Sequence, residues 1–181
     1  MKHEIRLSGL GGQGLVLAGR ILGEAATIHE NLYAVQKQSY GPEARGGASR
    51  SDVIIADAEV DFPYIDEADI LLTMSQEAYA KYAGRVRPEG ILIVDDLFVR
   101  AEPKKHPGRF FSLDFTRLAR NRLNNDIVAN IIALGAVAGL LGVVSRDSLL
   151  KVIEKRVPSR FIDVNTEALD LGFSLIGEDK G

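Results

Sequence analysis

Four glycines lie between residues 9 and 14 of this 181-residue chain, where an apolar strand pattern gives way to a helical pattern. Glycine lets the backbone turn sharply and lets a ligand or another backbone approach closely. The first amides of the helix that follows lack partners within the helix and lie at the positive end of its dipole, so they favour an anion such as phosphate or pyrophosphate. The candidate contacts of this first loop are Gly9, Gly11, Gly12, Gln13 and Gly14.

The spacing of Gly9, Gly11 and Gly14 fits the G-x-G-x-x-G pattern of dinucleotide-binding domains. A domain that binds NAD carries an acidic residue at the end of its second strand, about twenty residues further on, to hold the ribose hydroxyls. Here the second strand ends in Gln36 and Lys37. The missing acid counts against NAD, although Lys37 would tolerate a phosphorylated ribose. A tight turn that holds no ligand is the alternative to an anion site.

A second loop, residues 36–47, is polar and aperiodic and contains a Gly-Pro and a Gly-Gly pair. Long loops in compact domains are often functional. Arg45 lies between the two pairs, where its guanidinium could clamp a carboxylate or phosphate with two hydrogen bonds. Tyr40 and Glu43 could contact a ligand or tie the loop together, whereas Arg50 is interpreted as an ordinary structural arginine. The candidate contacts of this second loop are Tyr40, Gly41, Glu43, Arg45, Gly46 and Gly47.

The sequence predicts neither a catalytic centre nor a metal site. It contains no cysteine, which excludes disulfides, thiolate catalysis and the cysteine ligands of iron–sulfur clusters. The three histidines are far apart and lack metal-ligand spacing. Asp95 and Asp96 follow a buried strand and could hold a cation or a hydroxyl group, but two acids at such a place are as often only a turn. We therefore assign no catalytic residue and no metal ligand.

The bulk composition is that of an ordinary globular protein, with 46% hydrophobic residues and a net charge of −3. No block of lysine and arginine exceeds two residues, so a nucleic-acid surface has little support. The first residues lack the apolar core of a signal peptide, and we expect a cytoplasmic protein.

The elements that must position both loops alternate between short apolar runs and helical patterns. A strand over 5–7, a helix over 15–28 and a strand over 32–35 form a βαβ unit whose two strands should be parallel. Further strands are expected at 51–56, 70–74, 91–94 and 110–113, with a turn at 87–90. Further helices are expected at 76–83, 116–123, 127–141 and 147–156, and from Asn165 or Thr166 to 175.

This order predicts an α/β fold, a single Rossmann-like layered domain with a mainly parallel sheet and helices on both faces. The domain should span residues 1–176, and residues 177–181 should form a flexible tail.

The helix expected over 127–141, the longest in the chain, is apolar nearly all round. Its uncharged surroundings, residues 127–144, are near the lower limit for crossing a membrane, but glycines interrupt them and no aromatic belt or basic flank matches. A helix buried in the core or at an interface is therefore favoured over a membrane span. Gly135 and Gly139 lie on one face, where they would let the sheet or a partner approach closely.

Taken together, the two loops closely resemble the gamma subunit of 2-oxoacid:ferredoxin oxidoreductases of the 2-oxoglutarate, 2-ketoisovalerate and pyruvate types. The likeness rests on residues 9–14 and, more specifically, on residues 39–47. It covers nearly the whole chain and continues through residues 69–72, 88–95, 130–135 and 165–172. The full-length similarity is greatest to the 2-oxoglutarate type.

The resemblance implies a subunit of a multisubunit enzyme of anaerobic metabolism that is inactive alone. Such an enzyme oxidatively decarboxylates a 2-oxoacid to an acyl-coenzyme A and passes the electrons to ferredoxin. Thiamine diphosphate, magnesium, iron–sulfur clusters and coenzyme A act in the complex, and alpha, beta and delta subunits would carry them. This chain lacks the Gly-Asp-Gly and Asn pattern that holds the diphosphate through magnesium. It would bind no cofactor alone, and its two loops would frame the substrate or coenzyme A channel.

A stand-alone nucleotide- or anion-binding regulatory protein on the same fold is the alternative, and a complete NADP enzyme is a weaker one. As an isolated subunit, the chain would expose apolar surface that its partners normally cover. We therefore expect it to form a homodimer when it is purified alone.

Overall fold

The computed structural model describes residues 1–39 and 48–177. Within these residues the chain forms one six-stranded sheet in the order β2-β3-β1-β4-β5-β6. Strands β4, β5 and β6 extend the sheet from β1 in parallel, whereas β3 is antiparallel to both β1 and β2. The strands are β1 (Lys2–Leu10), β2 (Tyr33–Ser39), β3 (Ala48–Ala56), β4 (Ala68–Thr73), β5 (Val86–Asp95) and β6 (Arg109–Leu113). Some predicted features lie outside the described residues: residues 178–181 of the expected tail and the candidates Tyr40, Gly41, Glu43, Arg45, Gly46 and Gly47.

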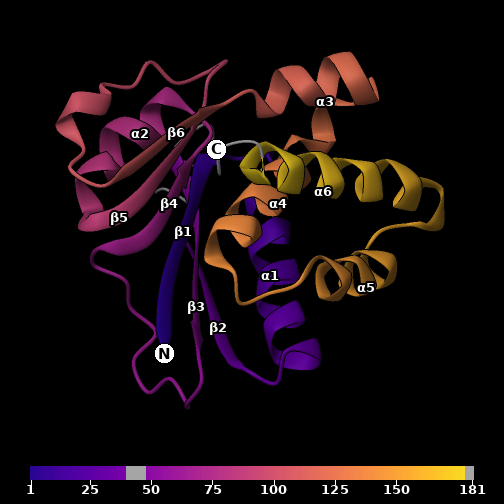
Figure 1. Ribbon diagram of the computed structural model, residues 1–181, viewed down its shortest axis with the longest axis horizontal. Coiled ribbons are helices and arrows are strands. Elements are labelled where there is room, and N and C mark those ends of the chain that lie inside the picture. Colours follow the sequence, from indigo (N-terminus) through magenta and orange to yellow (C-terminus); the bar gives the residue numbers. More distant parts are fainter. Residues whose placement is uncertain (40–47, 178–181) are drawn as a thin grey trace.

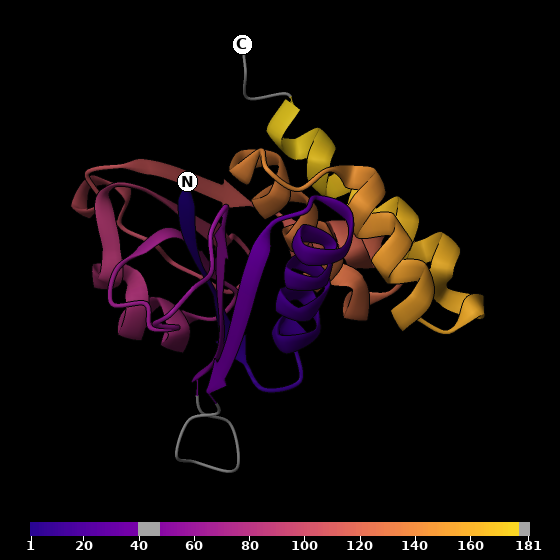
Figure 2. The ribbon, with the colours of Figure 1, turned by 90° about the horizontal axis from the view of Figure 1, so that it is seen from below.

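Helices cover both faces of the sheet, as the sequence predicts, but unequally (Figures 1 and 2). Of the described α-helices, one face carries α2 alone (Gln76–Tyr82), which contacts β1, β3 and β4. Helices α1 (Leu15–His29) and α4 (Ala129–Leu141) lie against the other face, and α3, α5 and α6 pack around them. These three outer helices are α3 (Phe115–Leu123), α5 (Arg146–Arg156) and α6 (Ile162–Gly177).

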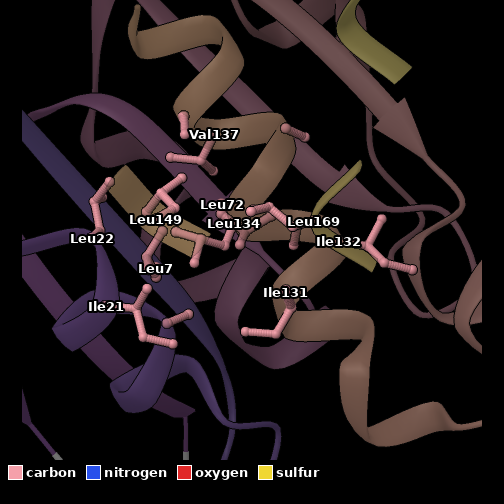
Figure 3. Close-up of a cluster of buried hydrophobic side chains, with 14 of the residues drawn as sticks. Leu7, Ile21, Leu22, Leu72, Ile131, Ile132, Leu134, Val137, Leu149 and Leu169 are labelled. Atoms are coloured by element: carbon pink, nitrogen blue, oxygen red, sulfur yellow. The ribbon is translucent and has the colours of Figure 1, made fainter. Parts of the chain in front are cut away.

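Alternation along the strands divides the interior into two cores. Side chains of successive strand residues point to opposite faces, so Ile70 and Leu72 join the large core under α1 and α4, while Leu71 joins the smaller core under α2. Because helices or loops cover both faces, the central strands are continuous apolar runs. Figure 3 shows the large core, in which Leu7 and Leu72 from the sheet lie near Ile21 and Leu22 of α1 and Leu134 of α4.

The predicted strands and helices are confirmed, with three corrections to their limits and pairing. Strand β2 continues to Ser39, so residues 36–39 belong to this strand and not to the second loop. It runs in the same direction as β1, but β3 lies between them, so the first βαβ unit does not pair its own strands. Residues 87–90 belong to β5 rather than to a turn, because the pairing skips from Ala68/Val86 to Ile70/Ile91 across a bulge.

The third correction concerns the last helix, α6, which begins at Ile162 and is the longest described helix. Asn165 and Thr166 do not cap it. Their side chains instead donate to the carbonyls of Phe161 and Ile162, at 2.8 and 2.9 Å, inside the first turns of the helix. By contrast, Asn125 does cap the 3₁₀ turn Asp126–Val128 that leads into α4, where its side chain accepts from the amide of Ile127.

The apolar helix α4 is buried, and no helix in the described part of the chain is long and apolar enough to cross a membrane. Its closest neighbour is α6, and the two backbones nearly touch. A Cβ added at Gly135 would lie 2.5 Å from the carbonyl oxygen of Leu169, and one at Gly172 would lie 2.0 Å from that of Ile132. The sequence therefore predicts the close approach at Gly135 correctly, and the partner is α6 of the same chain.

Replacement of Gly172 by alanine should lower the free energy of unfolding by about 3 kcal/mol, because the new methyl group forces two packed helix backbones apart. The measurement is chemical denaturation. Gly139→Ala in α4 is the matched control. Its new Cβ would come no closer than 3.4 Å to any neighbour, so we expect it to be neutral or to stabilise by up to about 1 kcal/mol. Equal losses in the two variants would contradict the account of the helix contact.

Candidate functional site

The first loop lies at the carboxyl end of β1, beside the carboxyl end of β4. From β1 the chain continues through α1 towards β2, whereas from β4 it continues through α2 to β5 on the other side. The two connections therefore diverge between β1 and β4. In open α/β sheets such a divergence at the carboxyl ends of the strands leaves a crevice where ligands bind.

The side chain of Gln13 closes this first loop. Its Oε1 accepts from the amide of Leu10 at 2.7 Å, and its Nε2 donates to the carbonyl of Met74 at 2.9 Å. A Cβ at Gly9 would lie 2.2 Å from the same Oε1. Gly9 therefore leaves room for the folded-back glutamine side chain, and Gln13 ties the loop to the end of β4.

Two more glycines of the loop have structural reasons. Gly12 and Gly14 adopt φ angles of 89° and 76°, in the left-handed region that favours glycine. Asn130 of α4 donates to the carbonyl of Gly14 at 3.0 Å, and a Cβ at Gly14 would lie 2.4 Å from Asn130 Nδ2. Among the glycines of this loop, Gly11 and Gly12 have open space beside them. The left-handed backbone of Gly12 and Gly14 and the contact with Asn130 are features of a tight turn, the alternative to an anion site.

The start of α1 keeps the features of an anion site. Gly14 is its N-cap and supplies no side-chain hydrogen bond, and the first turn contains no acidic residue. Strand β2 continues past the predicted end at Gln36 and Lys37 to Ser39, which is not acidic either. Gln36 Nε2 donates to the carbonyl of Val16 at 2.9 Å and to Ser51 Oγ at 2.8 Å, so this side chain joins β2 to α1.

A cleft of about 240 Å³ opens beside the first loop. Its lining is mainly apolar, and the titratable group in it, Asp126, pairs with Arg120 at 2.7 Å. The cleft can hold a ligand or a partner side chain, but it brings no nucleophile and base together. It is lined by Gly12, Gln13, Met74, Phe98, Thr116, Asp126, Ile127 and Ala129.

Asp95 and Asp96 at the end of β5 have opposite surroundings. Asp95 is fully buried and accepts from Thr116 Oγ1 at 2.5 Å and from the amide of Leu97 at 3.1 Å. Burial raises the pKa of Asp95 in spite of these hydrogen bonds. The exposed Asp96 accepts from Arg117 at 2.8 Å and from Ser112, which lower its pKa. Of the predicted alternatives, the described contacts favour the turn, because both carboxylates bind neighbouring protein groups.

The structure places the two ends of the second loop next to the first loop. In the antiparallel β1–β3 pair, Leu10 lies opposite Ala48, the first residue after the second loop. Strand β2 ends at Ser39 on the same edge of the sheet. The second-loop candidates themselves lie outside the described residues. Gln13 is among the predicted ligand contacts, and in the structure its side chain holds the loop closed. Asn130 has no local signal in the sequence, because its contact with Gly14 spans 116 residues.

Comparison with known proteins matches residues 4–175 to the family described as pyruvate ferredoxin/flavodoxin oxidoreductase. The 2-oxoglutarate synthase subunit KorC of Methanocaldococcus jannaschii is 44% identical over 98% of this chain and 96% of that protein. The pyruvate synthase subunit PorC of Methanothermobacter marburgensis is 30% identical over 94% of this chain and 95% of that protein. Among solved structures, the gamma subunit of the keto/oxoacid ferredoxin oxidoreductase of Geobacter sulfurreducens matches with a TM-score of 0.88 and 44% identity, covering 98% of each chain.

The two neighbouring aspartates should affect stability with opposite pH dependence. For Asp95, the folded chain holds its proton at higher pH than the unfolded chain, so rising pH lowers the free energy of unfolding through the window between the two pKa values. For Asp96 the folded pKa is the lower one, so rising pH raises stability through its window.

Denaturant unfolding of wild type and Asp95→Asn from acidic to neutral pH should therefore show the wild type losing stability relative to the variant. Asp96→Asn is the control. Relative to this variant, the wild type should gain stability as the pH rises, but only weakly, because the Asp96–Arg117 ion pair is exposed. The assignment would be contradicted if the stability difference between wild type and variant changed with pH in the same direction for both variants.

Proposed function

The chain belongs to the pyruvate ferredoxin/flavodoxin oxidoreductase family, and we propose that it is the gamma subunit of a 2-oxoacid:ferredoxin oxidoreductase that acts on 2-oxoglutarate. The observation that carries this proposal is the full-length match, at 44% identity, to a 2-oxoglutarate synthase subunit and to a gamma subunit of known structure. The pyruvate synthase subunit is less similar, at 30% identity. The choice of 2-oxoglutarate over pyruvate follows this difference.

In the proposed reaction, coenzyme A and a 2-oxoacid form an acyl-coenzyme A, carbon dioxide and the proton released from the thiol, and two electrons pass singly to ferredoxin. This chain contributes shape and contacts to that reaction rather than its reactive groups. It has no cysteine for an iron–sulfur cluster. In the part of the chain that the structure describes, no group of three or more histidine and acidic side chains could hold a metal ion. Sibling alpha, beta and delta subunits are proposed to hold thiamine diphosphate with magnesium, the clusters and the contact with ferredoxin.

Exposed apolar side chains around the first loop support a partner at this edge of the sheet. Ile127 is 81% exposed and lines both the cleft beside the first loop and a second apolar cleft between α1 and α6. Ile127 lines the first cleft together with Phe98 and the second together with Leu17 and Phe161. Exposed apolar side chains gathered in this way mark an interaction surface. We name this set the apolar rim, and it consists of Leu17, Phe98, Ile127 and Phe161.

We infer that the apolar rim packs against a sibling subunit and that both loops then face the shared active-site region. The first-loop residues Gly11 and Gly12 and the second-loop Arg45 would contact substrate or coenzyme A there, with Arg45 as a clamp for an anionic group. In the isolated chain a second copy would cover the apolar rim, which gives the expected homodimer. A cytoplasmic location remains part of this proposal.

Replacement of Ile127 by serine should weaken assembly with the sibling subunits at least about tenfold, because an exposed isoleucine at the centre of an interface is replaced by a polar group. The measurement is the affinity of the purified chain for the co-expressed sibling subunits. The matched control is Ile28→Ser, which changes an isoleucine that is 58% exposed near the far end of α1.

Both variants should fold like the wild type, because neither side chain is in the core. Two results would contradict the proposed interface. One is unchanged assembly of Ile127→Ser, and the other is an equal loss with Ile28→Ser.

A further inference from the structure

A polar pocket lies on the face of the sheet that carries α2, and it shares no residue with the cleft beside the first loop. It has a volume of about 260 Å³ and four basic side chains in its wall. They come from β1, β3, α2 and the 3₁₀ turn Ala83–Arg85 that follows α2. The lining residues are Arg6, Arg50, Tyr64, Ile65, Asp66, Lys81, Tyr82 and Arg85.

Three of these cations surround one aromatic ring. The guanidinium carbons of Arg6 and Arg50 lie 5.3 and 5.7 Å from the ring centre of Tyr82, and Lys81 Nζ lies 5.4 Å from it. Each contact is favourable, but only by about 0.5–1 kcal/mol where water is near. Like charges held this closely also repel one another. The ring therefore orients the cations without neutralising them.

The nearby carboxylates neutralise only part of the positive charge. Asp52, which is buried, accepts from Nε and Nη2 of Arg6 at 2.8 and 3.0 Å. Its Oδ2 is 3.5 Å from Arg50 Nε, too far for a good hydrogen bond. Arg6 Nη2 also donates to the carbonyl of Ile65 at 2.7 Å, so Arg6 is fixed as the floor of the pocket.

Arg50 and Lys81 are the two cations that remain available to a ligand at the pocket. Arg85 pairs with Asp66 at 2.6 Å, but both side chains are more than half exposed, so this pair holds the mouth only weakly. Within the described residues, no carboxylate lies within ion-pair distance of Lys81 Nζ, and Arg50 makes no hydrogen bond through its guanidinium. Four cations against the carboxylates of Asp52 and Asp66 leave a net charge of +2.

We propose that this pocket binds a phosphate group, either as the free ion or as part of a larger molecule that extends past Arg85. A phosphate near neutral pH carries between one and two negative charges and offers several acceptor oxygens, which suit the positive charge of the pocket and the donors of Arg50 and Lys81. The pocket is smaller than the roughly 300–1,000 Å³ of sites that enclose a drug-sized ligand, which suits a single anionic group. The site is separate from the apolar rim and does not rest on the proposed function.

Calorimetric titration of the full chain with inorganic phosphate, at constant ionic strength set with chloride, tests this site. Wild type should bind one phosphate per chain. Lys81→Gln and Arg50→Gln should each weaken the affinity about tenfold, because each removes one charge-assisted hydrogen bond. Lys151→Gln is the matched control, since it removes the same charge from an exposed position on α5, and it should bind like wild type.

Three outcomes would overturn the proposal: no phosphate binding by wild type, an equal loss in Lys151→Gln, or tighter binding of succinate than of phosphate. The first would show that no anion site exists, the second that binding reflects only net charge, and the third that the site selects carboxylates. Lys81 makes no ion pair with a described residue, so its replacement should leave the fold intact, and circular dichroism checks this. Because the titration needs no partner subunit, its failure would leave the proposed function untouched.

Discussion

Helices α4 and α6 meet through backbone atoms at Gly135 and Gly172, and this contact determines where the first loop can lie. With α6 packed so closely behind it, α4 is held against the sheet with nearly all of its side chains buried. That position brings Asn130, in the first turn of α4, against Gly14. Asn130 donates to the carbonyl oxygen of Gly14, and it lies so close that a side chain at position 14 would clash with it. The site edge is therefore supported from the C-terminal third of the chain, far from the loop in sequence.

The first loop is held closed by one of its own side chains, that of Gln13. Gln13 bridges the amide of Leu10 and the carbonyl of Met74, so it joins the ends of two parallel strands at the point where their connections diverge. The closed loop then presents Gly11 and Gly12 to open space, with apolar side chains around them. The opposite face of the sheet has a different character, since Arg6 and Asp52 form a buried pair between β1 and β3 under α2. One domain thus offers an apolar edge suited to a protein partner and a cationic pocket suited to a small anion.

Much of the fold could be predicted from sequence because each element has a local signal. The apolar runs of β4 and β5, the Ser75 cap of α2 and the glycines after β1 all act within a few residues. Strand pairing has no such signal: nothing local states that β3 inserts between β1 and β2. Pro88 and Gly90 look like a turn, yet they lie in a bulged part of β5 where Gly108 packs against the backbone. Asn165 and Thr166 look like caps, yet both bond backwards within α6. The contacts that shape the site, from Gln13 to Met74 and from Asn130 to Gly14, span 61 and 116 residues and could not be read from spacing.

The central claim is that this chain works as one subunit of a larger oxidoreductase, and purification from its native host tests it most directly. The chain should be isolated under anaerobic conditions and the proteins that remain bound identified by mass spectrometry. The account predicts that the chain is recovered in a stable complex with a thiamine-binding subunit and a cysteine-rich, ferredoxin-like subunit. This complex should reduce ferredoxin when 2-oxoglutarate is supplied. Recovery of the chain alone, carrying a bound nucleotide, would contradict it and would support a free-standing nucleotide-binding protein.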